Sequence, residues 1–220
     1  MRRSKTRDFV KRNCLALAVP LLICLLAHAA DPILLEPGRR VAGSSQAEWT
    51  RAWWQWAASF DRSSSPVADL TGELCASGQQ GSVWFLAGTY GTGRTVRTCT
   101  VPAGKYLFFP LINYVMFPRP HVMVSCAELV QDAKGYTDRA SNLVLRVDGR
   151  EIDGLDVQRI SSQGCFDLGK RQTPPEVIFP VAADGYYAML KPLSRGRHSI
   201  EFGGVLPSMI QAVSYTIDVK

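Results

Sequence analysis

The chain has few of the residues on which metal sites and nucleophilic sites depend. Its 220 residues include three histidines, one of them at position 28, and no two of its cysteines are spaced as CxxC. Zinc sites need clustered cysteine and histidine ligands. Hydrolases of the α/β type carry their nucleophile in a GxSxG sequence, which is also missing. We therefore expect no metal, no cofactor and no serine-histidine catalysis.

Long apolar runs are missing after residue 30, so the sequence predicts no membrane-spanning segment there, since a spanning helix needs about 20 apolar residues. The first 30 residues are different. Six basic residues precede an apolar core at 14–27, and Ala27-His28-Ala29 follows as a small-residue cleavage site. This pattern predicts an export signal peptide over 1–30 and a single exported domain over 31–220. A retained membrane anchor is the alternative.

An excess of positive charge is also missing once the predicted signal peptide is set aside. The whole chain has 25 Lys and Arg against 19 Asp and Glu, a net charge of +6. Residues 1–30 carry six of those basic residues and one of the acids, which leaves 19 basic and 18 acidic residues. A nearly neutral domain lacks the basic surface that nucleic-acid binding requires. We therefore expect no nucleic-acid partner.

What the sequence does contain is a series of short apolar runs bounded by turn residues, the pattern of a mainly β protein. Regular β-α-β alternation is missing, so we expect a two-sheet β-sandwich or jelly roll. Pro110 lies inside one expected strand and predicts an edge or a bulge, because proline cannot donate to a ladder. Asp148-Gly149 predicts a hairpin turn, and Ala183-Asp184-Gly185 predicts another turn. The expected strands are 82–89, 96–101, 106–113, 143–147, 150–153, 177–181, 186–190, 198–202 and 211–219.

Two helices are expected beside the strands, and each begins with a capping box, in which a serine and a glutamate satisfy free backbone N–H groups. Ser45 and Glu48 start the first, an N-terminal amphipathic helix that runs to about residue 60. Four aromatic residues at spacings of four, three and four share one face of it, so we expect them to pack on the sheet. Ser125 and Glu128 start a second, short helix, for which Gly135 is the expected C-cap. The four aromatic residues are Trp49, Trp53, Trp56 and Phe60.

Four cysteines remain after residue 30, an even number that predicts two disulfides in an exported chain. Four cysteines allow three pairings, and the sequence leaves all of them open. We favour Cys75–Cys99, because these two flank what would be a single hairpin-sized unit, and Cys126–Cys165 is then the remaining pair. A bridge of this kind stabilises a fold by about 2–4 kcal/mol, since it restricts the unfolded chain.

Five sequence segments in fixed order carry a resemblance to a known family. They are WWQW, TGELCASGQQGSVWFLAGT, CTVPAGKYLFFPLIN, VADGYYAML and PLSRGRHSIEFGG. Together they resemble a family of exported bacterial proteins of unknown function, from about Trp49 to Gly204. The resemblance implies export and a cysteine pair that matches Cys75 and Cys99, but no activity. Relatives commonly carry a further cysteine shortly after the third segment, where this chain has none.

Candidates for ligand contact come from aromatic and polar residues that the expected core does not absorb. Trp54 lies off the aromatic face of the first helix, so its ring is available to stack on a ligand. Four further residues are polar within or beside apolar runs, where each must find a hydrogen-bond partner or meet a ligand. The four are Gln79, Arg97, Lys105 and Asn113.

The sequence favours a non-catalytic extracytoplasmic module that binds a saccharide, an envelope component or a partner protein, or that has a structural role. This interpretation follows from an oxidised β-scaffold with spare aromatic residues and few catalytic groups. The alternative is a hydrolase of extracytoplasmic glycans that uses carboxylates as acid and base or nucleophile. Glu73, close to Cys75 in the second segment, is then the leading catalytic residue.

Overall fold

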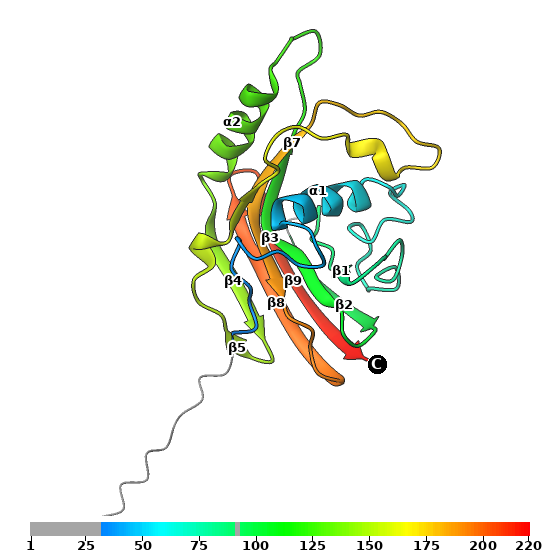
Figure 1. Ribbon diagram of the computed structural model, residues 1–220. Coiled ribbons are helices and arrows are strands. Elements are labelled where there is room, and N and C mark those ends of the chain that lie inside the picture. The colour runs from blue at the N-terminus through cyan, green and yellow to red at the C-terminus, as the bar shows by residue number, and fades with distance from the viewer. Residues whose placement is uncertain (1–31, 91–92) are drawn as a thin grey trace, which may run out of the picture. The chain divides into compact units, whose positions relative to one another are not determined.

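The computed structural model of the protein describes residues 32–90 and 93–220, so the predicted signal peptide lies outside the described residues. No helix in this part of the chain is long and apolar enough to span a membrane. Most of the regular structure is β, with two α-helices and two short 3-10 helices. In chain order the elements (Figure 1) are α1 (Gln46–Ala57), β1 (Val83–Phe85), β2 (Arg94–Val101), β3 (Tyr106–Met116), α2 (Cys126–Thr137), β4 (Ser141–Val147), β5 (Arg150–Glu151), η1 (Leu155–Val157), β6 (Arg159–Ser161), η2 (Leu168–Arg171), β7 (Ala182–Leu190), β8 (Gly196–Leu206) and β9 (Met209–Val219).

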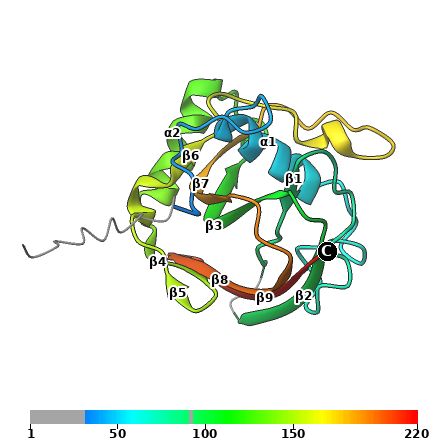
Figure 2. The ribbon, with the colours of Figure 1, turned by 60° about the horizontal axis from the view of Figure 1, so that its bottom comes forward.

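Two mixed sheets lie face to face, which confirms the predicted mainly β, sandwich-like fold. One has four strands in the order β1-β3-β7-β6, and the other has five in the order β2-β9-β8-β4-β5. In each sheet one pair is parallel, β1 with β3 and β2 with β9, and the remaining pairs are antiparallel. Figure 2 shows α1 as an outer layer, with the four-stranded sheet beneath it and the five-stranded sheet beneath that.

The burial of each strand follows from its layer. Side chains of β3 are buried on both faces through the middle of the strand, because the four-stranded sheet is covered by α1 on one side and by the other sheet on its opposite side. Strand β2 alternates strictly between exposed and buried residues, since the outer face of the five-stranded sheet is open to water. The main core between the sheets includes Phe109, Phe202 and Tyr215.

The first helix packs on the four-stranded sheet through its aromatic face, as the sequence predicts. The capping box of Ser45 and Glu48 is present. Trp53 and Trp56 are 2% and 0% exposed, and they pack with Phe85 and Phe108 in a second core beneath the helix. Trp49 and Phe60, at the two ends of the face, are partly buried against the same core.

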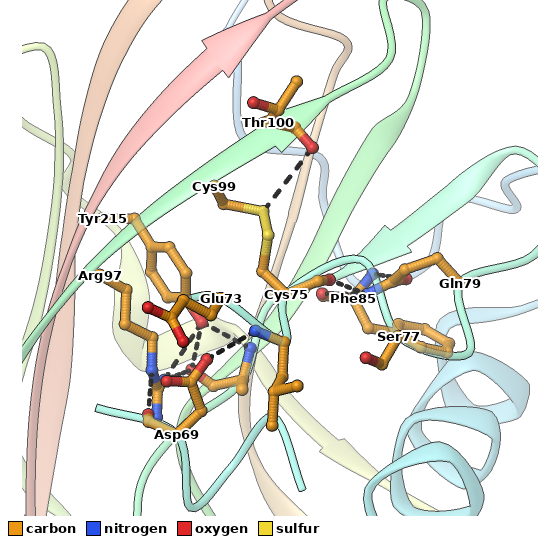
Figure 3. The surroundings of a disulfide bond; sticks show 12 residues. Asp69, Glu73, Cys75, Ser77, Gln79, Phe85, Arg97, Cys99, Thr100 and Tyr215 are labelled. Carbon is orange, nitrogen blue, oxygen red and sulfur yellow. Dashed lines mark hydrogen bonds between the residues drawn. A yellow bond between two sulfur atoms is a disulfide. The ribbon is translucent and has the colours of Figure 1, made fainter. Parts of the chain in front are cut away.

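The four cysteines pair as predicted, Cys75 with Cys99 and Cys126 with Cys165. The reason behind the first pairing is wrong, because β1 and β2 do not form a hairpin and lie in different sheets. The turn after β2, at residues 102–105, carries the chain from the five-stranded sheet to the four-stranded sheet. The first bridge fixes the loop before β1 to the edge strand β2 (Figure 3), and the second joins the start of α2 to the loop after β6.

Three local predictions are wrong, and a tertiary contact explains the first of them. The expected turn at 183–185 lies inside β7, where Asp184 is buried and accepts a hydrogen bond from Arg159 Nε at 2.8 Å. Residues 177–181 form no strand, since Val177 is 80% exposed and three prolines in the segment 174–180 cannot donate to a ladder. Gly135 lies inside α2, which continues to Thr137 and is capped by Asp138.

Two further turn and bulge predictions are confirmed. Asp148 and Gly149, both with positive φ, connect β4 to β5 in an antiparallel hairpin. Pro110 lies at an irregularity of β3, where the pairing with β7 shifts register, although β3 is an interior strand. The carbonyls at this bulge are satisfied from the opposite sheet, because Gln211 Nε2 donates to Pro110 O at 2.7 Å and to Leu111 O at 2.8 Å.

Candidate functional site

An apolar cavity of about 320 Å³ lies where α1, the end of β3 and the start of β9 meet the loop after β1. Among the described residues, its wall contains no carboxylate, imidazole, amine or guanidinium group. Ligand pockets are typically about 300–1,000 Å³ and mostly apolar, with a few polar groups that orient the ligand. The wall consists of Trp53, Trp54, Ala57, Val67, Gly88, Thr89, Tyr90, Asn113, Tyr114, Val115, Phe117, Met209 and Gln211. We refer to this feature as the apolar cavity.

The helix α1 places two tryptophans in the wall of the apolar cavity. Trp53 is held in the core by its indole N–H, which donates to Leu86 O at 3.0 Å. Trp54, the next residue, points away from the aromatic face and packs edge-on against Trp53, with ring centroids 5.2 Å apart. Its ring is partly buried and lines the cavity. Two of the predicted ligand contacts, Trp54 and Asn113, are therefore brought together here.

A buried tyrosine connects those two residues. Trp54 Nε1 donates to Tyr187 Oη at 3.0 Å, and Asn113 Nδ2 donates to the same oxygen at 3.2 Å. Burial raises the pKa of Tyr187 well above its usual value, so the phenol stays neutral. The phenol is therefore a hydrogen-bond anchor for the cavity wall rather than an acid or base. Asn113 Oδ1 accepts no hydrogen bond from the described residues.

The opposite rim of the apolar cavity is shaped by Gln211 and Gly88. The Gln211 amide spans the two sheets, since its Nε2 binds the bulge carbonyls of β3 and its Oε1 accepts from Thr89 N–H at 3.1 Å. A Cβ atom at Gly88 would lie 2.3 Å from Gln211 Oε1, so a larger residue there would displace the Gln211 amide from its present position. Sequence reasoning did not single out Gln211, because its partners are 100 to 122 residues away along the chain.

A second, more polar groove adjoins the apolar cavity. It encloses about 550 Å³ between α2 and the loop that follows β3, and Phe117 lines both spaces. Its wall combines apolar side chains with four charged ones, namely Arg119, Glu128, Asp132 and Arg139. We refer to this feature as the charged groove.

An aromatic stack lies between the apolar cavity and the charged groove. Tyr114, in the cavity wall, stacks on Tyr136 of α2 with ring centroids 3.9 Å apart. Arg139 covers the same ring, with its Cζ 5.1 Å from the centroid. Because Tyr136 and Arg139 line the groove, this stack connects the wall of the apolar cavity to a guanidinium group of the charged groove.

Arg97, another predicted ligand contact, has a structural role instead. It is 1% exposed, and its guanidinium donates to the carbonyls of Val67, Asp69, Ala87 and Gly88 and to Tyr215 Oη. Its cationic carbon also lies 5.6 Å from the centre of the Tyr215 ring. Figure 3 shows Arg97 with two of these partners, Asp69 and Tyr215, near the first disulfide. Arg97 thus supports the cavity from behind, because two of its carbonyl partners belong to wall residues.

The remaining predicted site residues lie outside the apolar cavity and the charged groove. Gln79 joins its own loop to β1, since its amide donates to Cys75 O and Phe85 O and accepts from Phe85 N–H. The Lys105 ammonium contacts the carbonyl of Gly81. Glu73 is exposed beside the first disulfide, and it lines neither space (Figure 3).

A serine, a histidine and an aspartate do come together elsewhere, at the end of the five-stranded sheet. His198 Nδ1 lies 2.8 Å from Asp148 Oδ2, and His198 Nε2 lies 3.3 Å from Ser194 Oγ. However, Nε2 lies 2.9 Å from the Ser194 carbonyl oxygen, which can only accept, so this nitrogen carries a proton. A protonated nitrogen cannot take the serine proton. The three residues therefore clamp two turns together and form no nucleophilic site.

Comparison of this chain with protein-family models, with curated proteins and with solved structures finds no match. The family resemblance of the five sequence segments therefore stays an expectation. We therefore infer a function from the chemistry of the apolar cavity.

Proposed function

We propose that the protein is a non-catalytic extracytoplasmic binding module and that its ligand places a small apolar group in the apolar cavity. The size of the cavity supports this proposal, since about 320 Å³ lies within the range of small-molecule sites. Two tryptophans and two tyrosines in the wall supply large contact areas at little cost in side-chain entropy. The two disulfides support an oxidising location, and export by the predicted signal peptide is part of the proposal.

The observation that carries the proposal is that side-chain donors in the cavity wall are already hydrogen-bonded within the protein. The Trp54 indole N–H is engaged by Tyr187, and both donors of the Gln211 amide are engaged by backbone carbonyls. A saccharide hydroxyl buried here would lose its hydrogen bonds to water with few replacements, which costs about 1–3 kcal/mol per group. An apolar group meets no such penalty. We therefore propose an apolar ligand instead of the saccharide expected from the sequence.

The two carboxylates beside the first disulfide do not support the alternative, a carboxylate-dependent hydrolase. Glycoside hydrolysis needs two carboxyl groups on either side of a bound substrate. Glu73 is exposed, and the carboxylate of Asp69 in the same loop accepts from the N–H groups of Thr71 and Leu74. Those hydrogen bonds outweigh partial burial and lower the pKa of Asp69, so Asp69 stays ionised and acts as a turn-forming residue.

A blocked cavity tests the proposal. Val115 lines the apolar cavity from β3, and Val96 points outward from β2 with 61% of its surface exposed. The variant Val115→Phe fills part of the cavity, whereas Val96→Phe is a matched control that adds the same volume elsewhere. We expect the wild-type protein and Val96→Phe to bind an uncharged naphthylamine dye with increased dye fluorescence, and Val115→Phe to bind it at least about tenfold more weakly.

Each variant should first be shown to melt cooperatively, so that lost binding is not lost folding. Equal dye affinity in Val115→Phe and the wild-type protein would contradict the proposal, because the dye would then bind somewhere else. Thermal stabilisation of the wild-type protein by glycans, and not by apolar compounds, would also contradict it.

A further inference from the structure

The apolar cavity and the charged groove share one side chain, Phe117, at the point where β3 ends. Tyr114 and Val115 of β3 line the first space, and Met116, the last residue of the strand, lines the second. Phe117 is 46% exposed, so no other side chain covers it completely. A single ligand could therefore pass over this ring and occupy both spaces.

The two arginines of the charged groove have no ion-pair partner among the described residues. Arg139 is held over the Tyr136 ring, and no carboxylate lies within ion-pair distance of Arg119 or Arg139 in this part of the chain. By contrast, Arg159, on the other side of α2, binds both Asp138 and Asp184. The groove thus presents two exposed guanidinium groups, which bind carboxylate and phosphate well because their N–H groups form a fork.

The two carboxylates of the groove differ in their availability. Glu128 belongs to the capping box of α2, and hydrogen bonds from the Ser125 N–H and hydroxyl lower its pKa. Its charge is therefore already matched by donors at the start of the helix. Asp132, one turn further along, accepts no hydrogen bond from the described residues and opposes an anion in the groove.

We propose that one molecule occupies both spaces: a single-chain amphiphile with an anionic head, its chain in the apolar cavity and its head at Arg119 and Arg139. This inference rests on the proposed function, because it needs the cavity to take an apolar group. The chain gains from leaving water along the aromatic wall. The head remains partly hydrated in the groove, where charge-assisted hydrogen bonds replace some of its water.

The head chemistry has two possible sources, a fatty-acid carboxylate or the phosphate of a single-chain phospholipid. Dodecanoate and dodecyl phosphate represent them with one and the same chain, and dodecanol supplies that chain without a charge. The experiment measures the dissociation constant of each probe by isothermal titration calorimetry, on the oxidised protein recovered from a secreting host. Tighter binding of one anion than of the other identifies the source.

Charge variants of the groove separate the head from the chain. The double variant Arg119→Gln/Arg139→Gln removes both guanidinium charges, and Asp132→Asn removes the opposing carboxylate. Arg62→Gln, at an exposed arginine that lines neither space, is the matched control. All of these side chains are exposed, so we expect unchanged melting temperatures.

The inference predicts opposite effects of the two groove variants. The double arginine variant should weaken binding of the anionic probes by about tenfold or more, and Asp132→Asn should strengthen it by about two- to fivefold. Binding of dodecanol should stay within about twofold in every variant, and Arg62→Gln should behave as the wild-type protein does.

Equal changes in the dissociation constants of the anionic probes and of dodecanol in these variants would overturn the inference. The proposed function would still hold in that case if dodecanol itself binds. Failure of all three probes to bind would overturn both. Higher affinity for dodecyltrimethylammonium than for the two anions would also overturn the inference, because the groove would then select the opposite charge.

Discussion

At the scale of single residues, Arg97 determines the local structure behind the apolar cavity. Its buried guanidinium donates to a carbonyl of the loop after α1, that of Val67, and to two carbonyls of the segment after β1, those of Ala87 and Gly88. It also donates to the hydroxyl of Tyr215 on β9. The carbonyls of Val67 and Gly88 have no other donor among the described residues, and proteins avoid buried acceptors without donors. Its position between Val67 and Gly88, both in the cavity wall, makes the shape of the site depend on this residue.

Replacing Arg97 with methionine should therefore destabilise the protein by about 3 kcal/mol or more, because several buried acceptors lose their donor at once. Arg94→Gln is the matched control on the same strand, since its side chain is exposed and its ion pair with Glu201 contributes at most about 1 kcal/mol. Urea unfolding of both variants measures the difference. Equal losses would show that Arg97 is not the support described above.

A second residue-scale feature, the clamp of His198 and Asp148, depends on pH. Partial burial of His198 would lower its pKa, but its hydrogen bonds with Asp148 and the Ser194 carbonyl outweigh this effect and raise it. For Asp148, hydrogen bonds from His198 and the Ser199 N–H outweigh partial burial and lower the pKa. Both groups are therefore charged in the folded protein between the lowered pKa of Asp148 and the raised pKa of His198.

The stability due to the clamp should follow these two shifts. The histidine contribution is complete below its ordinary pKa of 6.5 and is lost as pH rises through the raised value in the folded protein. The aspartate contribution is complete above its ordinary pKa of 3.8 and is lost as pH falls through the lowered value. The difference in unfolding free energy between the wild-type protein and His198→Gln should thus be largest between the two ordinary pKa values, that is, between pH 3.8 and pH 6.5. A difference that grows at alkaline pH would contradict this account.

At the scale of elements, the first disulfide fixes a loop that has little regular structure of its own. Residues 71–80 contain turns, and they are held to β2 by the Cys75–Cys99 bridge and by the hydrogen bond from Thr98 N–H to Thr71 O. The bridge also covers the edge of β2, where an unpaired strand could join a second chain.

Removal of this bridge should lower the free energy of unfolding by about 2–4 kcal/mol, because the unfolded chain regains the freedom of the closed loop. The double variant Cys75→Ser/Cys99→Ser tests this by denaturant unfolding, with Cys126→Ser/Cys165→Ser as the companion for the second bridge. A non-reducing peptide map of the exported wild-type protein should show both linkages. Free thiols at these four positions would contradict the pairing.

The elements that the sequence predicts well are those with local causes. The capping box of Ser45 and Glu48 lies within four residues, and so does the Asp148-Gly149 turn, so both are visible in the chain itself. Asp184 is different, because the sequence Ala183-Asp184-Gly185 indicates a turn while Arg159, from another strand, binds Asp184 within β7. The pairing of β2 with β9 and the crossing between sheets at 102–105 have no local signal at all.

At the scale of the whole molecule, the candidate site is assembled from distant parts of the chain. Trp54 and Tyr187, joined by a hydrogen bond, are separated by 133 positions, and Asn113 joins them from a third element. The sequence singled out Trp54 and Asn113, the first because it lies off a helical face and the second because it is polar in an apolar run. It could not show that they meet, or that Gln79, Arg97 and Lys105 lie elsewhere.

The central claim is that the apolar cavity binds an apolar group, and nuclear magnetic resonance tests it most directly. Titration of the labelled protein with dodecanol should give saturable shifts of the Trp54 indole N–H and of the Val115 methyl groups, with direct contacts from the ligand chain to both. The methyl groups of Val96, on the outer face of β2, should not move. Shifts confined to Val96 and its neighbours, or no saturable shift at Trp54 and Val115, would contradict the claim.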